Sequence, residues 1–478
     1  MSKTIIIIGA GLAGLSAALQ AAENGCNVKL VSSFPSERAQ SVMAEGGINA
    51  ALNTKDENDS PEEHFTDTIK AACGLADPNA VWGMTQAAPE LVHWLLKLGV
   101  KFNMSGYDDV DLRNFGGQKK KRTAFAQSDT GKQIMTAMID AVRRKEASGM
   151  VERFSHHSFL TLRLCGNICC GCVIRDEYSQ ETVELPGDAV IVATGGMHGL
   201  FGNTTGSLSN TGEVTAELFR LGVPLANGEM IQYHPTTVKC GGKRMLISEA
   251  ARGEGGRLFA MKDGKQWYFM EEKYPELGNL MPRDITAREI WKVSHESEVF
   301  LDMTEISEEI ISNKLSGLAD DCMTYLHKDI RKEPVSVLPG IHYFMGGILV
   351  DEQHRTPIQN LYAAGECCAQ YHGANRLGGN SLLGALYGGR VAAKSACEQA
   401  DVVDLSCATQ IDFPPASQIS EIKQLNKVMQ ETMGVVRNEN TLLNGIQTVQ
   451  ALTGNLPLLG MAVLKSALAR KESRGAHW

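Results

Sequence analysis

The sequence predicts an α/β fold built on a parallel, nucleotide-binding sheet, with an inserted α+β domain and a helical segment at the C-terminal end. A β-branched run at 4–8, a glycine-rich turn, a helical pattern at 15–24 and a second strand-like run at 28–32 form a βαβ pattern. Further buried-strand runs at 189–193 and 360–364 bring the chain back to the same sheet. With 478 residues, the chain is long enough for more than one domain.

The order of these runs divides the chain into four segments. The predicted nucleotide-binding domain comprises residues 1–236 and 341–411, the inserted capping domain residues 237–340, and the C-terminal helical segment residues 412–478. Pro414 and Pro415 mark the last boundary. The final helix is predicted over 456–472, with Asn455 as its N-cap and Pro457 in its first turn.

Charge and hydropathy exclude several classes of protein. A net charge of −9 gives no broad cationic field, so no nucleic-acid partner is expected, and the basic run Lys119 to Arg122 is interpreted as a solvated turn. No stretch approaches the roughly 20 apolar residues of a membrane span. The apolar start carries spaced glycines and no cleavage site, which favours mature structure over a signal peptide. We therefore expect a cytoplasmic chain that could reach a membrane only through partners.

Twelve cysteines are present, and we expect them to be reduced. Cys165, Cys169, Cys170 and Cys172 resemble a metal cluster, but Gly166-Asn167 between them predicts a hairpin. Alternating faces of a hairpin do not direct four sulfurs to one ion, so packed thiols are favoured and no metal site is predicted.

Three glycines carry the nucleotide prediction. In Gly9-x-Gly11-x-x-Gly14, the first permits a tight turn, the second lets the backbone approach a pyrophosphate, and the third allows close packing of helix on strand. Ser32 stands where an NAD-binding protein would have an acid, which argues against NAD. Gly46 and Gly47 could offer backbone N–H groups to further phosphate, as a longer ligand such as FAD requires.

Seven ordered motifs resemble those of the flavoprotein subunits of succinate dehydrogenase and fumarate reductase, over nearly the whole chain. They are Ala44-Glu45-Gly46-Gly47, Asn114-Phe115-Gly116-Gly117, the stretch 232–236 (QYHPT), the stretch 248–256 (SEAARGEGG), Pro282-Arg283-Asp284, the stretch 342–347 (HYFMGG) and the stretch 372–377 (HGANRL). Residues 263–291 look most like the versions in menaquinone-linked bacterial complexes. The resemblance implies a glutathione-reductase-like FAD-binding Rossmann domain, a capping domain and a helical segment.

The resemblance also implies residues that hold the cofactor. By motif match, Glu366 would bind the ribose region of FAD. The other predicted cofactor residues come from the pattern described above: Ser32 at the end of the second strand, and Gly9, Gly11, Gly14, Gly46 and Gly47 at the phosphates. Asn380, Ser381, Leu382 and Leu383 would open a helix whose N-terminus faces the pyrimidine edge of the flavin, where the reduced ring is negative.

A second set is implied to bind and convert a small dicarboxylate, fumarate or succinate. His234, Ser248, His342 and Arg376 would hold its two carboxylates and Phe115 its carbon chain. Arg283 would donate the proton and be reloaded through Glu249 and Arg252. His64, His156, His157, His198 and His354 lie outside the motifs and are interpreted as structural.

Two departures from the family pattern bear on function. Gln40 stands where many relatives have the histidine that bonds covalently to the flavin, so FAD should bind non-covalently, with a lower potential that favours fumarate reduction. Residues 474–478 end where relatives usually continue into an extension that helps to contact an iron-sulfur subunit. An iron-sulfur subunit and a quinone-linked membrane anchor are therefore implied partners whose contact stays open.

Three alternatives remain. L-Aspartate oxidase shares the fold and a similar ending at 470–474, but usually has an acid where this chain has Phe115. A reductase of another unsaturated acid would need only a changed pocket. A non-catalytic flavin-binding scaffold is disfavoured by the complete set Arg283, Arg376, His234 and His342.

Overall fold

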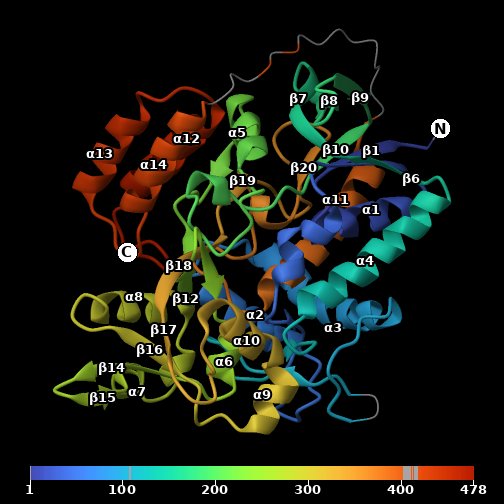
Figure 1. The fold of residues 1–478 in the computed structure, drawn as a ribbon. Helices are drawn as coiled ribbons and strands as arrows, with labels where there is room; N and C mark the ends of the chain where they lie inside the picture. The colour runs from blue at the N-terminus through green and yellow to red at the C-terminus, as the bar shows by residue number, and fades with distance from the viewer. Residues whose placement is uncertain (1, 107–108, 402–410, 412, 414–417) are drawn as a thin grey trace.

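The computed structural model of the protein describes residues 2–106, 109–401, 411, 413 and 418–478. Pro414 and Pro415, taken above as a boundary, lie outside the described residues. Figure 1 shows a parallel sheet flanked by helices, the capping region on one side of it, and the C-terminal helices α12–α14 as a separate group beside α5.

The central sheet has five parallel strands in the order β20-β10-β1-β2-β6. They are β20 (Leu361–Ala363), β10 (Ala189–Val192), β1 (Thr4–Ile8), β2 (Asn27–Ser32) and β6 (Val151–Ser155). The predicted strands are confirmed to within one residue at either end. Ile5 and Ile7 of β1 face the helical layer, and Ile6 and Ile8 face the opposite side, so both faces of the sheet are buried, as in doubly covered parallel sheets.

Helices cover one face of this sheet. They are α1 (Leu12–Glu23), α3 (Pro78–Lys97), α4 (Thr130–Ala147) and α11 (Asn380–Gln399), with α2 (Pro61–Ala71) beside α3. The first helix begins at Leu12, three residues before the predicted start. Small residues let α1 and α11 pack closely, because a Cβ on Gly389 would lie 2.3 Å from the Ala13 carbonyl oxygen.

A three-stranded antiparallel sheet covers the other face. It comprises β7 (His157–Cys165), β8 (Ile168–Asp176) and β9 (Thr182–Pro186), and the Cys165↔Ile168 pairing confirms the hairpin around Gly166-Asn167. Cys169 and Cys172 are buried free thiols, and burial raises the pKa of Cys169 to about 12, which disfavours the thiolate that a metal needs. Cys165 is disulfide-bonded, so the expectation of a reduced thiol is wrong at that position.

The capping region carries two antiparallel sheets and its own apolar core. The first sheet is β13 (Lys243–Leu246), β12 (Ile231–Cys240) and β18 (Leu338–Phe344), and the second is β15 (Lys265–Trp267), β14 (Arg257–Lys262), β16 (Val299–Asp302) and β17 (Val335–Ser336). The helices are α6 (Glu249–Gly253), α7 (Phe269–Lys273), α8 (Arg283–Val293), α9 (Glu308–Lys314) and α10 (Ser316–Asp321). The boundaries at 236/237 and 340/341 fall inside β12 and β18, and the domain limits stay predictions.

The C-terminal helices are α12 (Ile419–Thr432), α13 (Glu439–Val449) and α14 (Asn455–Ala469), and they pack on β12, β18 and α5 (Glu213–Arg220). The predicted cap of the last helix is wrong. Gly454 is the N-cap at φ +109°, while Asn455 is already helical and its amide donates to Glu217. The helix ends at Ala469 rather than at 472 because the following segment turns back to dock beside α8.

Short elements complete the fold and shape the site. The strands are β3 (Ile48–Asn49), β5 (Thr123–Ala124) and β4 (Leu112–Arg113) in one sheet and β11 (Leu225–Ala226), β19 (Gly347–Leu349) and β21 (Cys368–Ala369) in another. Single turns are η1 (Ser36–Arg38), η2 (Gln40–Met43), η3 (His198–Leu200), η4 (Gly278–Leu280), η5 (Cys322–Leu326) and η6 (Gly365–Cys367). In the part of the chain that the structure describes, no helix is long and apolar enough to cross a bilayer.

Candidate active site

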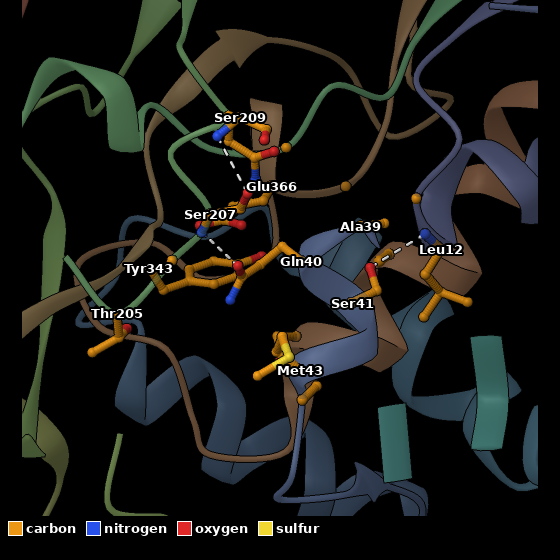
Figure 2. Close-up of a pocket in the computed structure, with 18 of the residues that line it drawn as sticks. Leu12, Ala39, Gln40, Ser41, Met43, Thr205, Ser207, Ser209, Tyr343 and Glu366 are labelled. Atoms are coloured by element: carbon orange, nitrogen blue, oxygen red, sulfur yellow. Dashed lines mark hydrogen bonds between the residues drawn. The ribbon is translucent and has the colours of Figure 1, made fainter. Parts of the chain in front are cut away.

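A cavity of about 730 Å³ lies at the carboxyl ends of the parallel strands and extends under the capping region. The glycine turn 9–13, the loop 40–47 and the start of α11 line one part of it. His234, residues 243–249 and Arg283 line the part beneath the cap. Such a crevice is where open α/β sheets bind nucleotides. Figure 2 shows Gln40, Ser41, Met43, Tyr343 and Glu366 around this space.

The glycine turn is built as its motif predicts. A Cβ on Gly9 would lie 2.2 Å from the Ala193 carbonyl oxygen, and one on Gly14 would lie 1.8 Å from the Gly9 carbonyl oxygen. Gly11 is the N-cap of α1 and has no side chain to cap the helix, so the N–H groups of the first turn that follow Leu12 are left for a ligand at the cavity. Ser41 Oγ accepts from the Leu12 N–H at 3.3 Å and fixes the loop 40–47 beside this turn.

The remaining predicted cofactor residues fall into two groups, those that line the cavity and those that are buried behind it. Ser32, Gly46, Gly47, Glu366, Ser381 and Leu382 line the cavity. Asn380 and Leu383 do not: Leu383 belongs to the core, and the Asn380 amide bonds Asn49, His64 and Thr68 behind the helix start. Those two residues therefore hold the N-terminus of α11 in place. The Asn380 N–H donates to the Leu377 carbonyl at 3.2 Å, and the next N–H groups, those of Ser381 and Leu382, are left for a ligand at the cavity.

The residues present fit an FAD molecule. Two helix N-termini, those of α1 and α11, point their donors at one elongated cavity. The Ser32 hydroxyl is buried at the end of β2 and has no hydrogen-bond partner among the described residues, so a ligand hydroxyl would satisfy it. Gln40 Oε1 accepts from the Ser207 N–H at 2.6 Å, which orients its side chain at the cavity (Figure 2).

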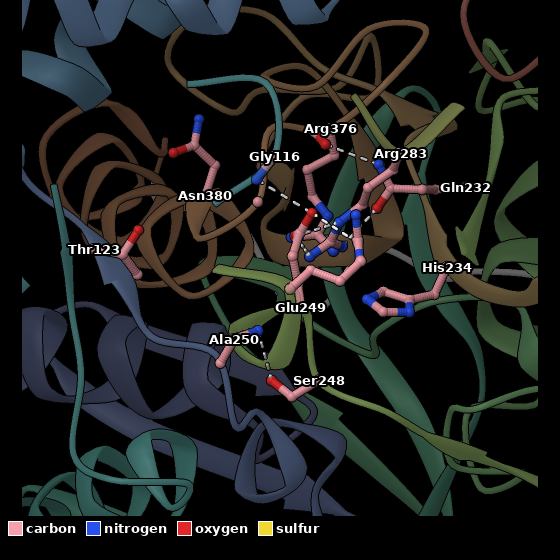
Figure 3. Close-up of polar contacts among 12 residues, drawn as sticks. Gly116, Thr123, Gln232, His234, Ser248, Glu249, Ala250, Arg283, Arg376 and Asn380 are labelled. Atoms are coloured by element: carbon pink, nitrogen blue, oxygen red, sulfur yellow. Dashed lines mark hydrogen bonds and ion pairs between the residues drawn. The ribbon is translucent and has the colours of Figure 1, made fainter. Parts of the chain in front are cut away.

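A buried ion-paired group lies beneath the cap (Figure 3). Glu249 Oε2 accepts from Arg283 Nε at 2.9 Å and from Nη2 at 2.6 Å, while its Oε1 accepts from Arg252 Nη2 at 3.1 Å. Burial raises the pKa of Glu249, but the charges of Arg283 and Arg252 outweigh it and hold that pKa below its usual range. Arg283 and Glu249 line the cavity, whereas Arg252 does not line it and pairs with Glu249, so the three form a chain leading away from the ligand space.

Two histidines and a second arginine face the same space. The rings of His234 and His342 lie 5.0 Å apart, and burial with the charge of Arg283 lowers the pKa of both well below the usual value, so both are neutral. Burial and Arg283 also lower the pKa of Arg376 to about 9. Its Nε has no hydrogen-bond partner among the described residues, although the guanidinium lies over the Tyr343 ring at 4.3 Å.

Phe115 and Ser248 complete the predicted substrate set at this cavity. Phe115 is 1% exposed and packs so tightly on Gly46 that a Cβ there would lie 2.8 Å from its ring. Ser248 is the N-cap of α6, where its hydroxyl accepts from the Ala250 N–H at 3.4 Å. The cap motif thus positions Ser248 and Glu249 together.

Sequence reasoning missed three polar residues that organise the site. Gln232 accepts from Arg283 Nη1 at 3.0 Å and donates to the Arg376 carbonyl at 2.8 Å, which joins the two arginines. Thr205 Oγ1 bonds His342 Nδ1 at 2.8 Å. His198, interpreted above as structural, lies 3.6 Å from Glu366. Gln232 stands within a quoted motif and could have been chosen, whereas the other two depend on tertiary contacts.

Comparisons with known proteins agree with this arrangement. Residues 4–382 match the FAD binding domain family. The chain is 40% identical to the succinate dehydrogenase flavoprotein subunit of Bacillus subtilis, covering all of this chain and 90% of that one. It is 35% identical to the L-aspartate oxidase of Caulobacter vibrioides, covering 99% and 92%.

A solved structure supports the same assignment. A mutant form of the E. coli quinol fumarate reductase chain FrdA superposes with a TM-score of 0.90 at 27% identity, covering all of this chain and 91% of that one. The resemblance and the fold class predicted from the motifs are therefore confirmed. The chain belongs to the family of FAD-dependent oxidoreductases that contains the flavoprotein subunits of succinate dehydrogenase and fumarate reductase and the L-aspartate oxidases.

Proposed function

We propose that this chain is the catalytic flavoprotein subunit of a fumarate reductase or succinate dehydrogenase and interconverts fumarate and succinate. The observation that carries the proposal is the convergence of Arg283, Arg376, His234 and His342 on one cavity under the cap. Two guanidinium groups and two neutral imidazoles offer enough donors for both carboxylates of a small dianion. FAD, when bound beside them, supplies the hydride.

Arg376 and the histidines bind and orient the dianion. The unpartnered Nε of Arg376 provides a donor for one carboxylate, and Tyr343 beneath the guanidinium fixes its plane. With His234 Nδ1 accepting from the Thr236 N–H at 3.3 Å and His342 Nδ1 accepting from the Thr205 hydroxyl at 2.8 Å, each neutral ring keeps its proton on Nε2. Both Nε2–H groups are then left to donate to the second carboxylate. These fixed donors stabilise the negative charge that grows on a carboxylate as the double bond is reduced.

Arg283 holds the proton that the reaction needs. Its Nε and Nη2 face Glu249 and its Nη1 faces Gln232, so the guanidinium is fixed in one plane beside the substrate groups. Glu249 also accepts from Arg252, which supports reloading of Arg283 along this chain of three residues. The buried cap, with Phe115 and Ser248 at the cavity, excludes water from the proton transfer.

The test uses photoreduced, FAD-loaded protein without an added electron donor. Fumarate should reoxidise the flavin within a few seconds of mixing in a stopped-flow instrument. The amount of succinate formed should equal the amount of flavin reoxidised. An absent response to fumarate, together with reduction of the oxidised, FAD-loaded protein by L-aspartate in a separate sample, would instead identify an aspartate oxidase. Silence toward both, with reoxidation by another unsaturated acid, would assign that acid as the substrate.

Phe115 favours the dicarboxylate over aspartate. A substrate ammonium needs an acidic or other acceptor group, whereas the buried Phe115 ring offers an apolar surface packed between Gly46 and Gly378. The Phe115→Glu variant tests this directly. Fumarate reduction should fall in that variant, and unchanged fumarate reduction would show that Phe115 does not face the substrate.

We further propose that FAD is bound non-covalently. The Gln40 side chain carries an amide, held by the Ser207 N–H, and an amide does not form the histidyl linkage of relatives. Acid precipitation of the holoprotein should release all of the flavin into the supernatant. Flavin that stays with the pellet after washing would contradict the proposal. Loss of the covalent link also supports a lower flavin potential, where each 30 mV is about 1.4 kcal/mol for two electrons.

Partners are proposed from the relatives alone. The names of the Bacillus subtilis and Wolinella succinogenes proteins describe flavoprotein subunits, which supports an iron-sulfur subunit and, through it, a quinone-linked membrane anchor. Affinity purification from the native host, followed by mass spectrometry and iron analysis, tests both. The cytoplasmic location predicted above stays a prediction.

A further inference from the structure

His198 lies beside the proposed cofactor contact Glu366, yet neither the family motifs nor the sequence pattern gives it a role. The residue opens η3, directly after the Gly195-Gly196 turn that follows β10, and its side chain is fully buried. Buried polar side chains are normally hydrogen-bonded. The Nε2 atom of His198 has no such partner among the described residues.

Gly206 and Phe344 pack against the imidazole. A Cβ on Gly206 would lie 2.1 Å from the ring, so the ring fills the space that a side chain at 206 would occupy. Phe344 contacts it edge-on, with ring centres 4.9 Å apart. A Cβ on Gly196 would lie 2.7 Å from both Phe344 and Glu366 Oε1, so the carboxylate is packed into the same corner.

One hydrogen-bond arrangement of this ring places its proton on Nε2, and a hydrogen bond to Glu366 depends on that arrangement. Nδ1 lies 3.0 Å from Thr204 Oγ1, which already accepts from the Gly206 N–H at 3.2 Å. The threonine hydroxyl has one hydrogen to donate, and with that hydrogen directed at His198 Nδ1 the proton of the neutral ring is on Nε2. The Nε2–H group therefore faces the nearby Glu366 Oε1, at 3.6 Å.

We infer that His198 is a positioning residue for FAD, which donates from Nε2 to the Glu366 carboxylate and holds that carboxylate toward the hydroxyl groups of the cofactor. Glu366 lines the cavity and is otherwise held by the Phe344 N–H at 3.1 Å. One backbone donor leaves the carboxylate free to turn about it, and a second donor on the same oxygen fixes its direction. The separation exceeds a normal hydrogen bond by only a few tenths of an ångström, which a small side-chain rotation closes.

The segment 204–207 connects the His198 contact to two other parts of the site. Thr204 bonds His198, Thr205 bonds His342, and the Ser207 N–H bonds Gln40. The same four residues therefore join the Glu366 corner to the substrate histidine and to the position of the missing flavin linkage. Without a covalent link, polar contacts such as this one carry more of the affinity for FAD.

The experiment measures FAD dissociation from diluted holoprotein by the recovery of free-flavin fluorescence. His198→Leu should raise the dissociation constant about tenfold, which corresponds to about 1.4 kcal/mol, because the carboxylate loses a hydrogen-bond donor. His198→Gln, which keeps an N–H near the Nε2 position, should recover most of that loss. In the Glu366→Gln background, His198→Leu should have a smaller effect than in the wild type, since an amide oxygen accepts more weakly than a carboxylate.

Several results would overturn the inference. Equal losses for His198→Leu and His198→Gln, or full additivity with Glu366→Gln, would show a packing role alone. Unchanged FAD affinity in His198→Leu or in Glu366→Gln would show that the contact between the two residues does not contribute to FAD binding. If the substituted chains do not fold, nitrogen-15 NMR of histidine-labelled wild-type holoprotein tests the inference through the tautomer of His198. The inference requires a proton on Nε2, and a proton on Nδ1 instead would refute it. None of these readouts depends on the substrate, so the outcome is independent of the proposed reaction.

Discussion

Replacing Arg283 by lysine gives the sharpest test of the proposed chemistry. The guanidinium makes three contacts, from Nε and Nη2 to Glu249 and from Nη1 to Gln232. A lysine ammonium keeps the charge but cannot reach both partners in one plane. We expect it to stay with Glu249, which leaves the Gln232 amide oxygen buried without a donor at a cost of about 1–3 kcal/mol.

In Arg283→Lys, the rate of flavin reoxidation should fall by a larger factor than the affinity for succinate. A positioned general acid contributes about 10²–10⁴-fold to a rate, so reoxidation of the reduced flavin by fumarate should slow by at least about 100-fold in Arg283→Lys. Binding of succinate keeps Arg376, His234 and His342, so its dissociation constant should rise only about tenfold, which corresponds to about 1.4 kcal/mol. Stopped-flow reoxidation gives the rate, and the spectral shift of bound FAD gives the affinity.

A matched control separates the loss of an acid from the general effect of altering a buried arginine. Arg437 is also buried and donates to the Glu229 carbonyl at 2.7 Å, but it does not line the cavity. Arg437→Lys should lower stability and leave the fumarate rate within about threefold of wild type. A fumarate rate close to wild type in Arg283→Lys would refute the role of this residue as proton donor.

The remaining predictions concern stability and cofactor binding. Burial lowers the pKa of His64 from 6.5 to about 3, so the folded state binds fewer protons than the unfolded chain and stability falls as the pH drops from 6.5 toward 3. At pH 5 this group costs about 2 kcal/mol, and His64→Gln should therefore flatten the dependence of urea unfolding on pH between 7 and 5; an equal slope would contradict the assignment. Gly14→Ala should prevent FAD retention on gel filtration, because the new Cβ would lie 1.8 Å from the Gly9 carbonyl oxygen. Gly25→Ala is the control: its Cβ would meet no atom within 4 Å, so this variant should keep the flavin despite a strained φ of +79°. Gly46→Ala should displace the Phe115 ring and weaken malonate binding at least about tenfold, measured by flavin spectral titration, and wild-type affinity would show that this contact is not needed.

Local patterns in the sequence determined the nucleotide-binding elements. The β-branched run 4–8, the spacing of Gly9, Gly11 and Gly14, and the later runs at 189–193 and 360–364 are short-range signals, and the parallel strands appear where they predict them. The motifs also identified the predicted substrate residues, because each of these residues lies in a segment with a recognisable local order. The cap of the last helix was missed, since Gly454 at positive φ and the Asn455–Glu217 contact depend on a neighbour 238 residues away.

Only the tertiary structure decided how those residues act together. Glu249, Arg283 and Gln232 come from α6, α8 and β12, and their ion pairs exist because the cap folds these elements onto one another. Asn380 and Leu383 belong to the predicted cofactor motif but turn away from the cavity, since only one side of the α11 start can face a ligand. His198 shows the same limit most clearly: a lone histidine carries no local signal, and its place beside Glu366 arises from the packing of Gly196, Gly206 and Phe344. Periodicity and turn chemistry act over a few residues, whereas burial, charge and hydrogen-bond partners are set by segments that meet only in the folded chain.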